Sequence, residues 1–159
     1  MLLNSLPMQL NFNHIFPELP DHSRIWLYLA ERKLDSTELH FVEEKLQEFL
    51  ITWNAHGKIL NCNGTIIFSQ YLILSVNEEI ESASGCSIDS SVRFVKTLEK
   101  ELNVDFFNRM NVLSIINENE TTTSNYFEAI NDKILFLNPL VQNLGELREN
   151  WIIMPSTVK

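Results

Sequence analysis

Apolar and polar residues recur along the chain with two different periods, and these periods predict the order of its strands and helices. Residues 24–30, RIWLYLA, form an apolar run rich in aromatic and β-favouring residues, which is typical of a buried strand. Asp35 then begins a helix, with Glu38 in the position of a capping box. The apolar stripe of this helix has helical spacing and consists of Leu39, Val42, Leu46, Phe49, Leu50 and Trp53.

Two strands are predicted after this helix, over residues 59–69 and 71–77. Gly57, in the sequence AHGK, is expected to end the helix because glycine readily adopts the left-handed cap conformation. The second strand, YLILSV, is almost entirely apolar, as a central strand of a sheet would be. One parity of the first strand is apolar and predicts a buried face: Leu60, Cys62, Ile66 and Phe68.

A second long helix is predicted over residues 88–102, followed by a strand over 109–116. The order β-α-β-β-α-β predicts an α+β fold with a ferredoxin-like split core. We expect a single domain over 1–159, with an irregular, proline-containing arm over 1–20, the ferredoxin-like core over 21–117 and an extension over 118–159. The extension is predicted to contain a helix in TTTSNYFEAIND, a strand in KILFL and a short helix or turn in LGELRENW.

Charge and cysteine content narrow the function classes. The formal net charge of −9 argues against nucleic acid or an anionic membrane as partner, although a local site remains able to bind a small anionic ligand. The two cysteines, Cys62 and Cys86, suggest no disulfide framework, so a reduced, cytoplasmic protein is expected. No cofactor is predicted. A homodimer is plausible, because split β-α-β domains often pair through sheets or helices.

The most unusual stretch is SASGCSIDSSVRF, residues 82–94, which concentrates small polar residues before the second helix. In the predicted topology, the loop after the first helix and the loop before the second lie at one end of the sheet, so His56 and Cys86 are expected to be close together. His22, Ser23 and Arg24 belong to the same end. A metal site built from His22, His56, Cys86 and Asp89 matches no known ligand spacing, so no metal is predicted.

Three interpretations of this stretch remain open. A helix N-terminus offers free amide groups that attract anions, which suggests a ligand site for phosphate or carboxylate. The residues assigned to that site are Gly85, Ser87, Asp89, Ser90, Ser91 and Arg93. In the second interpretation the protein is a cysteine-dependent enzyme with Cys86 as nucleophile and His56 as base. In the third, the serines and Asp89 only cap the helix, with Ser87 or Asp89 as N-cap. We adopt small-ligand or anion binding as the expected function.

Four segments resemble a family of small bacterial proteins of unknown function that are commonly labelled "ABC transporter ATPase": WNAHGK, SGCSIDSSVRFVKTLEKEL, DFFNRM and the closing NW. The resemblance extends from about Pro20 to Trp151. The chain lacks the P-loop that such an ATPase needs, because Gly57-Lys58 is its only Gly-Lys pair and Thr52 and Ile59 stand where the motif requires Gly and Ser or Thr. The ATPase label is therefore unsupported by the sequence.

Overall fold

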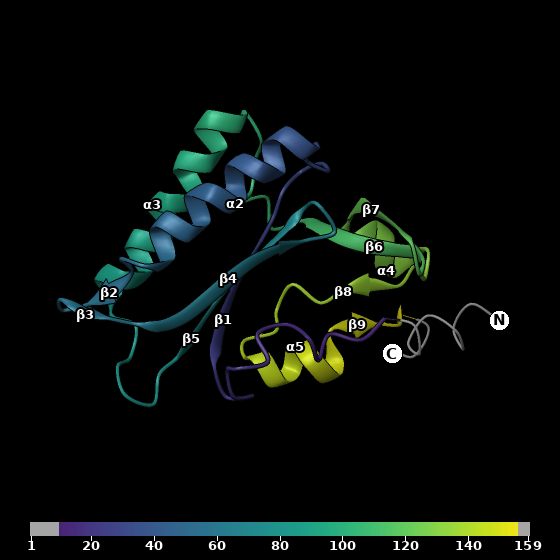
Figure 1. Cartoon of the computed structure of the whole chain (residues 1–159). Coiled ribbons are helices and arrows are strands. Elements are labelled where there is room, and N and C mark those ends of the chain that lie inside the picture. The colour runs from purple at the N-terminus through teal and green to yellow at the C-terminus, as the bar shows by residue number, and fades with distance from the viewer. Residues whose placement is uncertain (1–9, 156–159) are drawn as a thin grey trace.

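The computed structural model describes residues 10–155 and shows a mixed α and β fold with three antiparallel sheets (Figure 1). The elements that build the first half of the chain are β1 (Arg24–Leu29), α2 (Ser36–Leu50), β2 (Asn54–Ala55), β3 (Lys58–Ile59), β4 (Asn61–Ile67), β5 (Tyr71–Asn77) and α3 (Gly85–Leu102). Those of the second half are β6 (Asn111–Asn117), β7 (Glu120–Asn125), α4 (Tyr126–Asn131), β8 (Phe136–Leu137), α5 (Leu144–Asn150) and β9 (Ile152–Ile153).

The first sheet has the strand order β1-β5-β4, and the helices α2 and α3 lie side by side over one of its faces (Figure 1). The strand β5 is buried on both faces, which confirms the prediction that YLILSV is a central strand. Leu72, Leu74 and Val76 pack toward the helices, while Tyr71 and Ile73 pack into a core on the opposite face. This alternation follows from the two-residue period of a strand.

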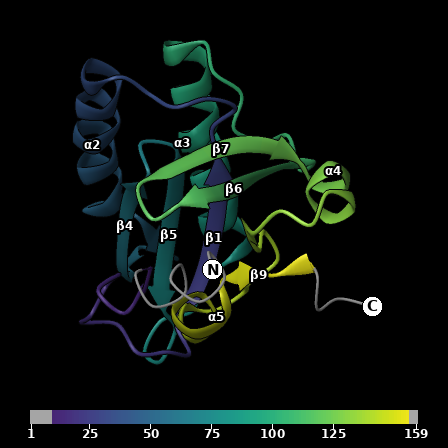
Figure 2. The same ribbon diagram turned by 90° about the vertical axis from the view of Figure 1, so that its right-hand side faces the viewer.

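The second sheet covers the other face of the first and has the order β7-β6-β8-β9. Figure 2 shows β6 and β7 crossing over the first sheet, with α5 packed below them. The core between the two sheets includes residues of β6 and α5 together with Phe12, Ile15, Phe16 and Leu19. The described part of the expected N-terminal arm is irregular, but it forms part of this core and is not peripheral.

The largely buried side chain of Arg148 holds that N-terminal segment in place. The Arg148 guanidinium donates hydrogen bonds of 3.0, 2.7 and 3.0 Å to the carbonyl oxygens of Ile15, Phe16 and Leu19, and it pairs with Asp21 at 2.7 Å. Charge-assisted hydrogen bonds of this kind satisfy carbonyl groups that would otherwise be buried without partners. Residues 1–9 of the predicted arm lie outside the described residues.

The ferredoxin-like arrangement is matched only in part. The strands β1, β5 and β4 have the order and directions that a split β-α-β sheet requires for its first three strands. The strand β6, expected to complete that sheet beside β1, pairs instead with β7 and β8. The four-stranded core expected over residues 21–117 is thus not formed as one sheet, and the free edge of β1 is a consequence.

Two predictions between α2 and β4 were wrong. Gly57 is not the C-terminal cap of α2, because the helix ends with Ile51 as its cap. His56 and Gly57, with φ angles of 53° and 82°, form the left-handed turn of the short hairpin β2–β3. The strand expected over 59–69 is accordingly divided into β3 and β4 at Leu60.

In the C-terminal region the helix expected in TTTSNYFEAIND begins later than predicted. Residues Thr121–Thr123 belong to β7, which pairs with β6, and the helix α4 occupies only the second half of the segment. Threonine is β-branched and favours a strand when a neighbouring strand is available for pairing. The strand expected in KILFL is reduced to β8, while α5 confirms the helix in LGELRENW. Within residues 10–155, no helix is both long and apolar enough to cross a bilayer.

Candidate functional site

The start of α3 is closed by its own side chains. Ser84 is the N-cap: its hydroxyl accepts the Ser87 amide at 3.1 Å, and the Ser87 hydroxyl accepts the Ser84 amide at 3.1 Å. The expectation that Ser87 or Asp89 would be the cap was therefore wrong, and the helix begins at Gly85 and not at residue 88. Ser84 rather than Ser87 has the extended backbone of an N-cap residue.

Ser87 also joins α3 to the hairpin that follows α2. Its hydroxyl donates to the Asn54 carbonyl oxygen at 2.7 Å, and its own carbonyl oxygen accepts the Trp53 indole N–H at 2.8 Å. Ser91 is fully buried, and its hydroxyl donates to the Ile88 carbonyl oxygen at 2.7 Å. Two of the residues assigned to a ligand site thus point into the molecule, with hydroxyls that are already hydrogen-bonded.

Gly85, Cys86 and Asp89 lie on the exposed side of the same helix turn. A side chain added at Gly85 would meet no atom within 4 Å, so the helix tip faces open space and not a walled cavity. Ser90 lies one turn further along and donates to the Cys86 carbonyl oxygen at 2.9 Å. The tip presents the amides of Gly85 and Cys86, but no wall encloses a ligand there.

The two loops expected to converge do so through Ser87 and Asn54, but His56 and Cys86 form no hydrogen bond with each other in the part of the chain that the structure describes. Both are exposed. His22 lies at the same end of the sheet, where its Nε2 atom is 2.9 Å from Glu79. Among residues 10–155, no three histidine, cysteine, aspartate or glutamate side chains are grouped closely enough to hold a metal ion.

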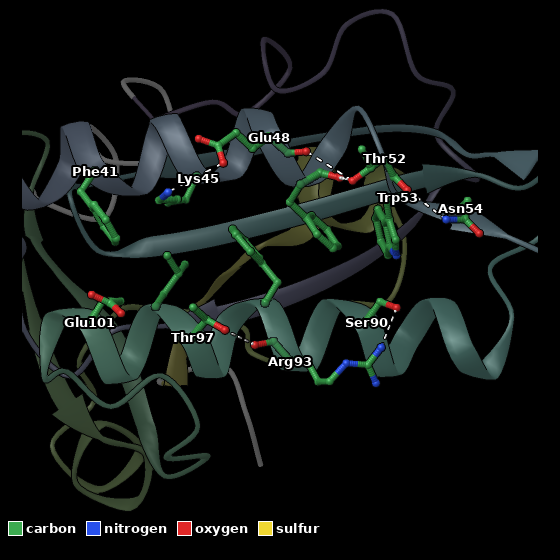
Figure 3. Close-up of a pocket in the computed structure, with 13 residues that line it drawn as sticks. Phe41, Lys45, Glu48, Thr52, Trp53, Asn54, Ser90, Arg93, Thr97 and Glu101 are labelled. Atoms are coloured by element: carbon green, nitrogen blue, oxygen red, sulfur yellow. Dashed lines mark hydrogen bonds and ion pairs between the residues drawn. The ribbon is translucent and has the colours of Figure 1, made fainter. Parts of the chain in front are cut away.

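A groove of about 820 Å³ lies between α2 and α3, and two of the expected site residues, Ser90 and Arg93, line it (Figure 3). Its apolar surface comes from five side chains: Phe41, Phe49, Trp53, Phe94 and Leu98. Its polar surface comes from Lys45, Glu48, Thr52, Asn54, Ser90, Arg93, Thr97 and Glu101. The volume is within the range of small-molecule sites, and the mixture of aromatic and polar groups is typical of them.

The charges along the groove are unequally neutralised. Lys45 is 3.7 Å from Glu48 and lies over the Phe41 ring, 5.8 Å from its centroid. The Arg93 guanidinium donates only to the Ser90 hydroxyl, at 3.2 Å, and among the described residues no carboxylate lies within ion-pair distance of it. In Figure 3 the exposed Arg93 side chain lies along α3 beside Ser90, and Glu101 lies further along the same helix, opposite Phe41.

Sequence reasoning missed the aromatic part of this site. Phe49 and Phe94 stack with centroids 4.5 Å apart and an interplanar angle of 9°, and they link the two helices across the groove. Phe49 was assigned to the apolar stripe of α2, and Phe94 follows Arg93 directly in the sequence. The available signal was the helical spacing that places Phe49 in the apolar stripe of the first helix.

Comparison with known proteins finds no family model, no curated protein and no solved structure that matches this chain. The resemblance to small bacterial proteins labelled as ATPases stays an expectation. Function is therefore inferred from the residues that the structure brings together.

Proposed function

We propose that this protein is a binding domain whose groove between α2 and α3 takes a small ligand with an anionic group and an apolar body. The anion is bound by Arg93 and Ser90, and the apolar part lies against the aromatic side chains of the groove. The proposed site therefore lies further along α3 than the helix tip where the sequence predicted it, among residues that line the groove.

The observation that carries this proposal is the Arg93 guanidinium, which has no carboxylate partner among the described residues and lies beside an aromatic groove. Guanidinium presents five donors in a planar arrangement suited to carboxylate or phosphate. Arg93 is exposed, and Arg109 likewise has no carboxylate within ion-pair distance in the described residues. What favours anion binding at Arg93, despite the net charge of −9, is its position beside the larger aromatic groove.

Further support comes from the neighbours of Arg93. Ser90, Asn54 and Thr52 line the same groove and offer neutral hydrogen-bond donors and acceptors for orienting a ligand. Cys86 and His56, the pair assigned to catalysis, do not line it. Binding without covalent chemistry is therefore the simpler proposal. We also infer that the β1-β5-β4 sheet with α2 and α3 is a ferredoxin-like half, and that the protein works in the reducing cytoplasm.

A ligand panel tests the proposal directly. Phenyl phosphate, AMP and decanoate each combine an anion with an aromatic or aliphatic group, and inorganic phosphate serves as the anion alone. We expect at least one amphipathic probe, but not inorganic phosphate, to raise Tm, and calorimetry to show affinity at least about tenfold weaker in Arg93→Ala, since hydrogen bonds to charged groups contribute about 1.5–3 kcal/mol.

Lys100→Ala is the matched control, because it removes one positive charge from the same helix outside the groove. It should leave the affinity of the bound probe within about twofold of wild type. Equal losses in both variants would show that only net charge matters. A panel without any binding probe would contradict the proposal.

A further inference from the structure

The strand β1 has a free edge in the middle of the molecule. Its only strand partner in the described residues is β5, and the Ala30 amide donates to the Gln70 carbonyl oxygen at 2.9 Å on that side. Because backbone groups alternate in direction along a strand, the amides and carbonyls of Ile25, Leu27 and Leu29 point away from β5. This is the side on which β6 would lie in a complete split β-α-β sheet.

Both ends of that edge are covered, but its centre is not. The Ile25 amide donates to the Gln142 carbonyl oxygen at 3.2 Å, and the Glu31 amide donates to the Asp105 carbonyl oxygen at 2.9 Å. Between them, the structure of residues 10–155 shows no backbone partner for Leu27 or Leu29. Two unpaired residues of the same parity are the pattern that one added strand satisfies.

A groove of about 390 Å³ runs along this part of β1. On the helix side its wall contains Ile88 and Val92 of α3 together with Phe106 and Phe107. On the side of the second sheet its wall contains Pro139 and Leu140, and Leu140 is 74% exposed. An unpaired strand edge at the floor and apolar walls on both sides fit the main chain and the alternating side chains of an extended peptide.

The charge at this groove is positive, although the protein as a whole is acidic. Arg109 is the one lining side chain with a formal charge among the described residues, and no carboxylate lies within ion-pair distance of it there. One more cation lies over an aromatic wall of the groove, since Lys96 is 4.5 Å from the Phe107 centroid. The Arg24 guanidinium lies 4.9 Å from the Trp26 centroid, but it is paired with the Glu78 carboxylate at 4.0 Å and adds little net charge. A peptide with a carboxylate group is electrostatically complementary to this region.

We propose that the free edge of β1 is a docking site for an extended, largely apolar peptide segment of a partner protein, with an acidic group beside Arg109. The peptide adds one strand to the first sheet, exchanging backbone hydrogen bonds with Leu27 and Leu29, and its side chains alternate between the two walls. The alternative occupant is a second copy of this chain paired through its own β1 edge, and the measurements below distinguish it from a peptide.

Peptides selected from a random phage-displayed library against the full chain provide the probes. Leu27→Pro removes the outward amide without removing a hydrogen bond to β5, and Leu27→Ala is the control that keeps the amide and shortens the side chain. We expect selected peptides to be apolar with an acidic residue, and to bind Leu27→Pro at least about tenfold more weakly than Leu27→Ala. Arg109→Ala should weaken them about two- to fivefold.

Two measurements do not depend on how well Leu27→Pro folds. Bound peptide should slow hydrogen exchange at the amides of Leu27 and Leu29 in the wild-type protein. N-methylation of the peptide should abolish binding at one parity of its residues and be tolerated at the other, which is the signature of strand pairing. Arg93→Ala should leave peptide binding unchanged, which separates this site from the groove between α2 and α3.

Several results would overturn the proposal. A selection that enriches no peptide would do so, as would enriched peptides that bind Leu27→Pro as tightly as wild type. Tolerance of N-methyl groups at both parities, or exchange protection elsewhere than β1, would show another binding mode. A dimer in sedimentation that Leu27→Pro abolishes would assign the edge to a second copy of the chain.

Discussion

The start of α3 and the edge of β1 differ in a way that their sequences conceal. The start of α3 concentrates small polar residues, yet its capping groups are bonded to one another, to Asn54 and to Trp53. The edge of β1 is an apolar strand, yet its backbone groups at Leu27 and Leu29 have no partner in the described residues. The apparently inert strand therefore has the greater unsatisfied hydrogen-bonding capacity.

This difference shows that the number of polar residues is a poor guide to a site. Serine hydroxyls near a helix start compete well for local amides and carbonyls, so a cluster of serines tends to satisfy itself. A backbone N–H or C=O group is left unpaired when the fold places no strand beside it. The side chain of that residue gives no indication of this. A binding site is better sought among groups whose expected partner is absent, such as Arg93 and the outward amides of β1.

Replacing Ser87 gives the largest expected effect and tests whether the start of α3 is structural. Ser87→Ala removes the hydroxyl that accepts the Ser84 amide, which is one half of the capping box, and the hydrogen bond to Asn54 inside a buried contact. We expect the free energy of unfolding to fall by about 2 kcal/mol, measured by urea denaturation. Ser90→Ala, in the next turn, is the control and should change it by less than about 0.5 kcal/mol. Equal losses of unfolding free energy in the two variants would contradict a special structural role of Ser87.

Alkylation of the cysteines tests the same region with an intermediate effect. Cys86 is exposed, while Cys62 is half-buried and burial raises the pKa of its thiol to about 11. Iodoacetamide at pH 8 should therefore label Cys86 at least about tenfold faster than Cys62, followed by mass spectrometry.

Faster labelling of Cys86 than of Cys62 does not by itself support catalysis, since the greater exposure of Cys86 accounts for it. The informative variant is His56→Ala, which we expect to leave the labelling rate of Cys86 within about twofold, because no hydrogen bond joins the two side chains in the described residues. A slower rate in His56→Ala would restore His56 as a base that activates the thiol.

The features that the sequence predicts well are those decided locally. The apolar run of β5 identifies a central strand, and the pair Asp35 and Glu38 identifies the start of α2, because neither depends on distant residues. The predicted β-α-β-β-α-β order also brings the loop after the first helix and the loop before the second to one end of the sheet, where Ser87 contacts Asn54. These regularities account for the first sheet, its helical layer and part of the candidate groove.

The features that it predicts poorly depend on which partner a segment finds. Thr121–Thr123 join β7 because β6 is available for pairing, and β6 in turn leaves the edge of β1 unpaired. Gly57 has the same left-handed preference in a helix cap and in a hairpin turn, so its residue type alone does not decide between them. The stacking of Phe49 on Phe94 requires the relative rotation of two helices, which the spacing of apolar residues leaves undefined.

The capped starts of α2 and α3 offer a smaller and finer contrast. The start of α3 is closed by Ser84 and Ser87, which carry no charge, whereas that of α2 is closed by two carboxylates. The Glu38 carboxylate accepts the Asp35 amide at 2.9 Å and two hydrogen bonds of 2.9 Å from the Arg32 guanidinium. Acid should therefore weaken the start of α2 and leave that of α3 unchanged.

The hydrogen bonds from Arg32, followed by the Asp35 amide, lower the pKa of Glu38 from 4.5 to about 2. Because the folded state has the lower pKa, this stabilisation is present above pH 4.5 and is lost as the pH falls toward 2. At pH 6 the Tm of the wild type should be higher than that of Glu38→Gln. The difference should be less than about 3 °C, since the pair of Arg32 and Glu38 is exposed. Calorimetry at stepwise lower pH should show this difference in Tm disappearing. A difference that persists at pH 2 would contradict the prediction, because it would mean that Glu38 stabilises the helix start by something other than its charge.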